Sequence, residues 1–199
     1  METPSLDQLP KKQQQLIESA RDLFCLHGIR RVTIEEICKN AQVSKMTYYK
    51  YFSNKLDIAR AVIDVMFSEG LQHYFAMLSE PSPFAEKVEK ILTLTLAQVH
   101  AVGATLMDEL MDGESPLHGY FLAKQKKTRE LSLDFFRTAQ KDGHIHSDIR
   151  MPVLLFMLDQ LSDLLNHPDF IQIMPNIEDR ASELAALFFH GFSRSPSQG

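Results

Sequence analysis

The stretch that decides the fold runs from Thr33 to Phe52 and reads TIEEICKNAQVSKMTYYKYF. Thr33 and Glu36 form a capping box, a pattern in which each side chain bonds the backbone amide of the other residue at the start of a helix. Residues 40–43 are predicted to form a turn, and Ser44 is a second helix N-cap. The stretch therefore predicts two short helices joined by a tight turn.

The apolar residues of these two helices can anchor them to a core. Ile34, Ile37 and Ala41 fall on the inward face of the first helix, and Val43 and Phe52 bracket the second. The polar groups that can then face outward belong to Ser44, Lys45, Thr47, Tyr49, Lys50 and Tyr51.

This arrangement is typical of a helix-turn-helix, whose second helix enters the major groove and contacts phosphates and base edges. The alternative is a trihelical domain with a polar surface, in which Tyr48, Tyr49 and Tyr51 simply pack.

Helices are also predicted outside this motif. Residues 9–27 carry one apolar face at helical spacing, and Gly28 suits the left-handed position that ends a helix. Residues 53–54 can cap a longer helix that reaches about residue 67. Later helical patterns cover residues 84–111, 116–141, 151–166 and 177–192. Because strand-like alternation is nearly absent, we predict an all-α protein, with three short N-terminal helices joined to a helical bundle.

Charge is divided unevenly along the chain. The net charge is −5, but residues 1–60 carry ten Lys or Arg against seven Asp or Glu, a balance of +3. Residues 61–199 carry eleven against nineteen, a balance of −8. A basic first third followed by an acidic remainder indicates that only the N-terminal part meets phosphate.

Other features exclude several classes of protein. The polar N-terminus lacks the apolar segment of a signal peptide, and no apolar run is long enough to span a bilayer. Two cysteines, Cys25 and Cys38, are too few for a disulfide framework and are expected to be inert buried thiols. No phosphate-binding glycine loop, nucleophile elbow or zinc-protease motif occurs. We expect a cytoplasmic protein that is not an enzyme and has no cofactor.

Several segments of residues 20–60 have the order and spacing of a known domain. They are ARDLF at 20–24 with Gly28, TIEEI at 33–37, AQVSK at 41–45, TYYKYF at 47–52 and SNKLD at 53–57. Together they resemble the DNA-binding domain of the TetR family of bacterial regulators. The later helices match that family only in length and class.

The resemblance implies a set of DNA-contacting residues. They are Thr33, Ser44, Lys45, Met46, Thr47, Tyr49, Lys50, Tyr51 and Lys55. Tyr49, Tyr51 and Lys55 stand at phosphate-contacting positions, whereas Val43, Tyr48 and Phe52 stand at core positions.

Two features depart from the family pattern. Met46 replaces the small residue common at the start of the recognition helix. Lys50 and Tyr51 stand where many members have Tyr and His. Base preference at these positions should therefore differ from that of relatives, while phosphate binding should survive.

The resemblance also implies a homodimer joined by C-terminal helices, with an effector pocket inside the bundle. Residues 153–165 and 184–189 are more apolar than one core face needs, as expected if two copies pair. Burial within a single chain is the alternative. The pocket candidates, for which ordinary core packing is the alternative, are Phe67, Phe75, Met107, Met111, Tyr120, Phe121, Phe135 and Phe136.

His144, His146 and Asp148 are candidates for a metal site, since histidine with carboxylate suits zinc. No further ligands lie at helical spacing, so we expect a solvated loop and no metal.

The function predicted from the sequence is that of a sequence-specific DNA-binding transcriptional regulator. We expect a repressor that a small-molecule effector releases from a palindromic operator. The predicted DNA-binding domain spans residues 9–56, with its motif at 33–52, and the predicted effector-binding and dimerisation domain spans 57–195. A regulator without a ligand and a helical protein-interaction module are the alternatives.

Overall fold

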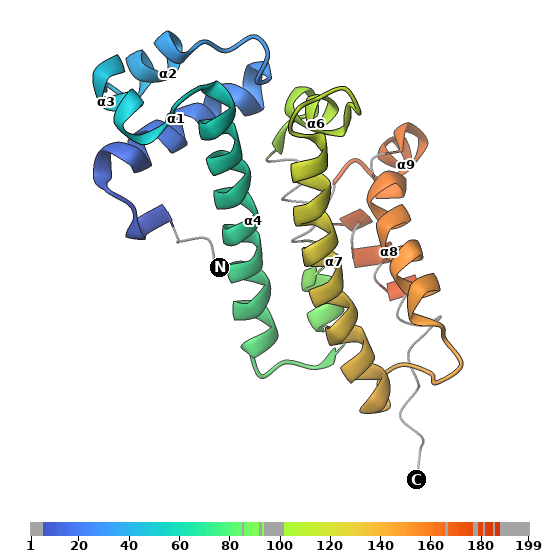
Figure 1. Ribbon diagram of the computed structural model, residues 1–199. Coiled ribbons are helices and arrows are strands. Elements are labelled where there is room, and N and C mark those ends of the chain that lie inside the picture. Colours follow the sequence, from blue (N-terminus) through green and yellow to red (C-terminus); the bar gives the residue numbers. More distant parts are fainter. Residues whose placement is uncertain are drawn as a thin grey trace. The chain divides into compact units, whose positions relative to one another are not determined.

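The computed structural model describes residues 6–84, 86–91, 93, 102–165, 167–176, 179–180, 182–184 and 186–187. Every regular element within these ranges is helical, which confirms the predicted all-α fold (Figure 1). The chain divides into two compact units, residues 1–73 with 99–126 and residues 74–98 with 127–199. Over the ranges given above, none of the helices has the length and apolar character needed to cross a membrane.

The first unit contains the predicted motif. Its helices are α1 (Lys11–His27), α2 (Ile34–Asn40), α3 (Lys45–Tyr51), most of α4 (Lys55–Ser79), α6 (Ala104–Met111) and the first turns of α7 (His118–Lys141), preceded by a 3₁₀ turn at Leu6–Gln8. Helices α2 and α3 both pack against α1 (Figure 1). The helices predicted around residues 9–27 and 33–52 are confirmed.

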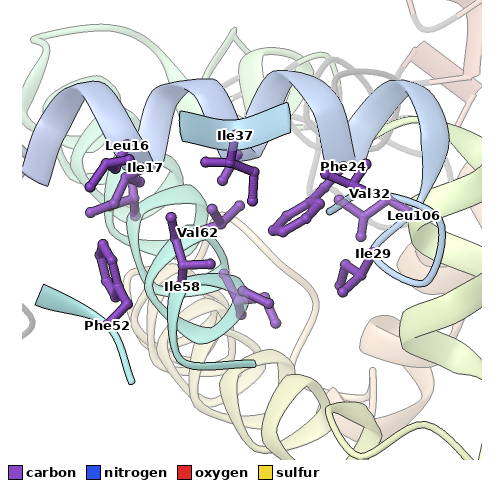
Figure 2. Close-up of a cluster of buried hydrophobic side chains, with 14 of the residues drawn as sticks. Leu16, Ile17, Phe24, Ile29, Val32, Ile37, Phe52, Ile58, Val62 and Leu106 are labelled. Carbon is purple, nitrogen blue, oxygen red and sulfur yellow. The ribbon is translucent and has the colours of Figure 1, made fainter. Parts of the chain in front are cut away.

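The core of the first unit lies between α1, α2 and α4. Leu16 and Ile17 of α1 meet Ile37 of α2 and Ile58 and Val62 of α4, as Figure 2 shows. Each of these side chains is at most 1% exposed. Burying one aliphatic side chain of this size contributes about 1.5–3 kcal/mol to folding, so this cluster holds the three helices together.

Helix α1 ends at Gly28 as predicted, but not in the predicted conformation. The residue has φ 78° and ψ 161°, which lies outside the left-handed helical region. An extended backbone with positive φ is essentially restricted to glycine. The chain therefore leaves α1 in a direction that other residues do not readily allow.

The helix predicted over residues 84–111 is wrong as a continuous element. Gly103 has φ 76° and ψ 142° and precedes the first residue of α6, Ala104. A β-carbon on Gly103 would lie 2.5 Å from the carbonyl oxygen of Cys25, so the start of α6 packs directly on the α1 backbone. Periodicity continues across this break and therefore does not reveal it.

The second unit is built on α8 (Met151–Leu165), whose predicted limits are confirmed, and α9 (Pro168–Ile173). Helix α9 is not predicted from the sequence, because Pro168 there indicates a helix break. In the structure Pro168 occupies a first-turn position that tolerates proline. The buried Arg180 donates from Nε to the carbonyl of Leu165 at 2.9 Å and so caps α8. Most of the predicted helix 177–192 lies outside the described residues.

Candidate nucleic-acid interface

The start of α2 has the predicted capping box. The Thr33 hydroxyl accepts from the Glu36 amide at 3.2 Å, and the Glu36 carboxylate accepts from the Thr33 amide at 2.7 Å. The hydrogen bond from the Thr33 backbone also holds the pKa of Glu36 below its usual value. These reciprocal bonds fix where α2 begins.

The turn between α2 and α3 uses a left-handed residue that is not glycine. Gln42 has φ 53°. Its amide bonds the carbonyl of Lys39 at 3.2 Å, and the amide of Val43 bonds the carbonyl of Cys38 at 2.9 Å. This pair of bonds is the Schellman pattern that ends a helix. The turn therefore sets the direction of α3 through the backbone.

Buried side chains on one side of α3 anchor the helix to the core. Tyr48 is fully buried, and its hydroxyl donates to the carbonyl of Asn54 at 3.0 Å. Its ring lies 5.6 Å from that of Phe52, and Val43 closes the other end of the helix with 8% exposure. Burial raises the pKa of the Tyr48 hydroxyl, so it remains a donor at neutral pH. The predicted core roles of these three residues are confirmed.

The opposite side of α3 faces outward. Met46 is 72% and Tyr49 56% exposed, and Lys45 and Lys50 are also exposed. A polar and basic side opposite a buried tyrosine is the arrangement expected of a helix that inserts into a DNA groove. We call Lys45, Met46, Tyr49 and Lys50 the reading face.

Three predicted contact residues are partly engaged within the protein. The Ser44 hydroxyl caps α3 by accepting from the Thr47 amide at 3.1 Å, and the two hydroxyl groups lie 2.9 Å apart. Tyr51 is half-buried and packs against the core of the first unit.

Lys45 and Lys55 have partners that the sequence did not indicate. Lys45 forms an ion pair with Glu35, and the hydrogen bond between them raises the pKa of Lys45 and lowers that of Glu35. Lys55 donates to the carbonyls of Arg30 at 3.1 Å and Val32 at 2.8 Å. An ammonium has three donors, so Lys55 keeps one for a phosphate.

The pocket candidates do not form one group. Phe67, Met107, Tyr120 and Phe121 belong to the core of the first unit, and Phe135 and Phe136 belong to that of the second. Phe75 and Met111 are 48% and 49% exposed. The Tyr120 hydroxyl donates to Asp64 at 2.5 Å, which sequence reasoning did not foresee because 56 residues separate the two.

The surroundings of the candidate histidines and the two cysteines do not favour metal binding or thiol reactivity. The His144 ring stacks on Phe84 with centroids 5.2 Å apart, and His146 is exposed. Within the described residues, no three His, Cys, Asp or Glu side chains are grouped as metal ligands would be. Burial raises the pKa of the Cys25 and Cys38 thiols, which disfavours the reactive thiolate.

Comparison with known proteins identifies the domain that carries the reading face. Residues 16–62 match the family model for bacterial regulatory proteins of the tetR family. The helix-turn-helix region of the chain is therefore similar to that of the tetR-family regulators. The match covers the buried residues of α1 through the first turns of α4, together with the whole helix-turn-helix.

Two kinds of relative extend the similarity over most of the chain. The uncharacterized HTH-type transcriptional regulator YdgC of Bacillus subtilis (strain 168) is 25% identical over 190 residues, covering 91% of this chain and 92% of its own. The fatty acid degradation regulator FadR from Bacillus halodurans has a TM-score of 0.75 at 18% identity, with 92% of this chain and 97% of that chain covered. A TetR-family regulator from Cytophaga hutchinsonii has the same TM-score at 14% identity, with 95% and 100% covered.

The protein is a DNA-binding transcriptional regulator, and α3 is the second helix of its helix-turn-helix. The similarity to the solved structures, at this low identity, concerns the fold alone.

Proposed function

We propose that the protein represses transcription by binding a palindromic operator as a homodimer, and that a small molecule releases it. The observation that carries this proposal is the reading face, where Lys45, Met46, Tyr49 and Lys50 are exposed around a helix fixed by buried Tyr48. A preorganised helix loses little conformational freedom when it enters a groove.

We assign the two kinds of DNA contact to different parts of the motif. Lys45, Met46 and Thr47 lie in the first turn of α3, the part of a recognition helix that contacts base edges. Phosphate contacts are assigned to Thr33, Ser44, Tyr49, Lys50, Tyr51 and Lys55. Met46 can contact a thymine methyl group, which an apolar side chain recognises in the major groove.

Selection from a random-sequence duplex library on the full-length protein tests this proposal. We expect an enriched inverted repeat whose half-sites are centred about 10 base pairs apart, one turn of the duplex. The affinity for the selected duplex should fall steeply as salt rises, because phosphate contacts release counterions. Failure to enrich any sequence, or an affinity independent of salt, would contradict the proposal and favour a protein-interaction module.

The proposed dimer uses one face of α8. Val153, Phe156, Met157 and Leu164 recur at helical spacing and are 45–57% exposed in the single chain. An exposed apolar row of this kind is typical of a helix that pairs with another subunit. Phe156→Asp should shift the protein toward monomers in analytical ultracentrifugation, while Phe156→Leu stays dimeric. If Phe156→Asp and Phe156→Leu sediment with the same molecular mass, the interface is contradicted.

The proposed effector binds in the second unit. Tyr74, Phe84, Phe135 and Phe136 form a chain of ring contacts with centroids 5.0–6.5 Å apart. Such a cluster favours an apolar or flat ligand. Fatty acids, steroids and planar aromatic compounds can be screened for raising the melting temperature and releasing DNA. We expect a hit whose effect is lost in Phe135→Ala. If no compound acts, a regulator without a ligand is favoured.

A further inference from the structure

The loop that joins α1 to α2, residues 28–32, is held by a side chain from a distant part of the first unit. The carboxylate of Glu109 on α6 accepts from the amide of Ile29 at 2.8 Å and from the amide of Arg30 at 3.1 Å. These amides follow α1 and have no helical acceptor, and a carboxylate is the strongest acceptor available to them. We call this pair of bonds the Glu109 clamp.

Two further side chains hold the same loop. The Arg30 guanidinium pairs with Asp112, which directly follows α6. On the other side, Lys55 at the start of α4 donates to the carbonyls of Arg30 and Val32. The loop amides are therefore tied to α6 and the loop carbonyls to α4.

The glycines beside the loop lie in close contact with residues of α6 and α1. A β-carbon on Gly28 would lie 2.3 Å from the Glu109 Oε1 and 3.1 Å from the Thr105 side chain. Gly103, at the start of α6, meets the α1 backbone with similar closeness. Figure 2 shows Ile29 and Val32 of the loop beside Phe24 and Leu106, so apolar packing lies under the clamp.

The loop leads directly into α2, which contacts the reading face through Glu35. Val32 precedes Thr33, the N-cap of α2, and α2 carries Glu35, the partner of Lys45 on the reading face. A displacement of the loop would move the N-cap of α2 and, through the turn at Gln42, the start of α3. Mispositioning by about 1 Å is enough to impair a preorganised site.

We propose that Glu109 is a positioning residue for operator recognition: by clamping the Ile29 and Arg30 amides it sets the helix-turn-helix in the orientation that reads bases. The inference rests on the DNA binding argued above. Glu109 is not among the residues predicted to contact DNA. On this inference its negative charge nevertheless favours DNA binding, because the charge holds the loop in place. Electrostatics alone dictates the opposite, because removing a negative charge from a protein strengthens its attraction to phosphate.

The two explanations predict opposite changes in DNA affinity when the Glu109 charge is removed, and this difference gives the test. Glu109→Gln keeps the shape of the side chain but replaces one acceptor with a donor, and Asp108→Asn removes the same charge from the neighbouring exposed residue. Affinity for the duplex selected by the wild-type protein and for a scrambled duplex is measured by fluorescence anisotropy, with melting temperatures recorded for each variant. Glu109→Gln should weaken binding to the selected duplex by about tenfold, since charge-assisted bonds are lost, and leave the scrambled duplex unaffected or slightly tighter. Asp108→Asn should strengthen both slightly.

A second variant disturbs the Glu109 clamp without replacing Glu109. Gly28→Ala places a methyl group against the Glu109 carboxylate and should lower selected-duplex affinity in the same way. Gly143→Ala is its matched control, because Gly143 also has a positive φ, 81°, and a β-carbon there meets nothing within 4 Å.

The outcomes separate this inference from the proposed function. If the wild-type protein selects no duplex, the proposed function fails. If it does, and folded Glu109→Gln binds the selected duplex as tightly as Asp108→Asn, only the positioning role is overturned. Equal weakening on both duplexes also overturns it, because a positioning residue affects recognition of sequence rather than attraction to phosphate.

Discussion

The Lys45 ammonium on the reading face is paired with the Glu35 carboxylate of α2. Both side chains are exposed, and the pair keeps the pKa of Lys45 raised. If α3 enters the groove as proposed, Lys45 exchanges this carboxylate for a base or a phosphate. On this proposal, Glu35 opposes the binding of DNA of any sequence.

Glu35→Gln should bind scrambled DNA more tightly, by about threefold, because it frees one cation and removes one anion near the phosphates. Glu18→Gln, which makes the same charge change on the exposed side of α1, is the control and should have a smaller effect. Anisotropy titrations at low and high salt measure both. Identical shifts in the two variants would mean that the ion pair does not matter.

The hydroxyl of Tyr48 joins the end of α3 to the cap of α4 through the carbonyl of Asn54. Tyr48→Phe removes this bond while keeping the buried ring, so it should lower the free energy of unfolding by about 1 kcal/mol. Urea denaturation followed by circular dichroism measures the change. An unchanged midpoint would show that the bond contributes nothing beyond packing.

Gln42 occupies a left-handed position that glycine adopts without steric cost. Gln42→Gly should therefore raise the free energy of unfolding by about 0.5–1 kcal/mol, whereas Gln42→Ala retains the strain. Thermal denaturation of the two variants compares them. Equal stability of glycine and alanine at this position would contradict the assigned turn.

The capping box of α2 should give a pH-dependent contribution to stability. Thr33→Ala should cost about 1 kcal/mol at neutral pH. Because the folded-state pKa of Glu36 is depressed, its contribution is present above the ordinary glutamate pKa and is lost as pH falls through the depressed value. The difference between wild type and Glu36→Gln should therefore shrink toward low pH in denaturation curves. A difference that grows toward low pH would contradict the capping role.

The local features of the motif could be predicted from the sequence because their partners are three or four residues apart. The Thr33 and Ser44 caps belong to this group, whereas the buried position of Tyr48 was expected only from the family resemblance. The Glu109 clamp could not be predicted in this way, since about 80 residues separate its carboxylate from the amides that it accepts. The break at Gly103 was missed because apolar periodicity takes no account of backbone φ.

Dimethyl sulfate protection of the selected duplex tests the central claim, that α3 reads DNA through the major groove, most directly. The reagent methylates guanine N7, which lies in the major groove. The wild-type protein should protect guanines in two blocks about one helical turn apart, and Lys45→Ala or Thr47→Ala should restore reactivity at individual guanines within them. Bound protein that leaves every guanine reactive, or variants with an unchanged pattern, would contradict the claim.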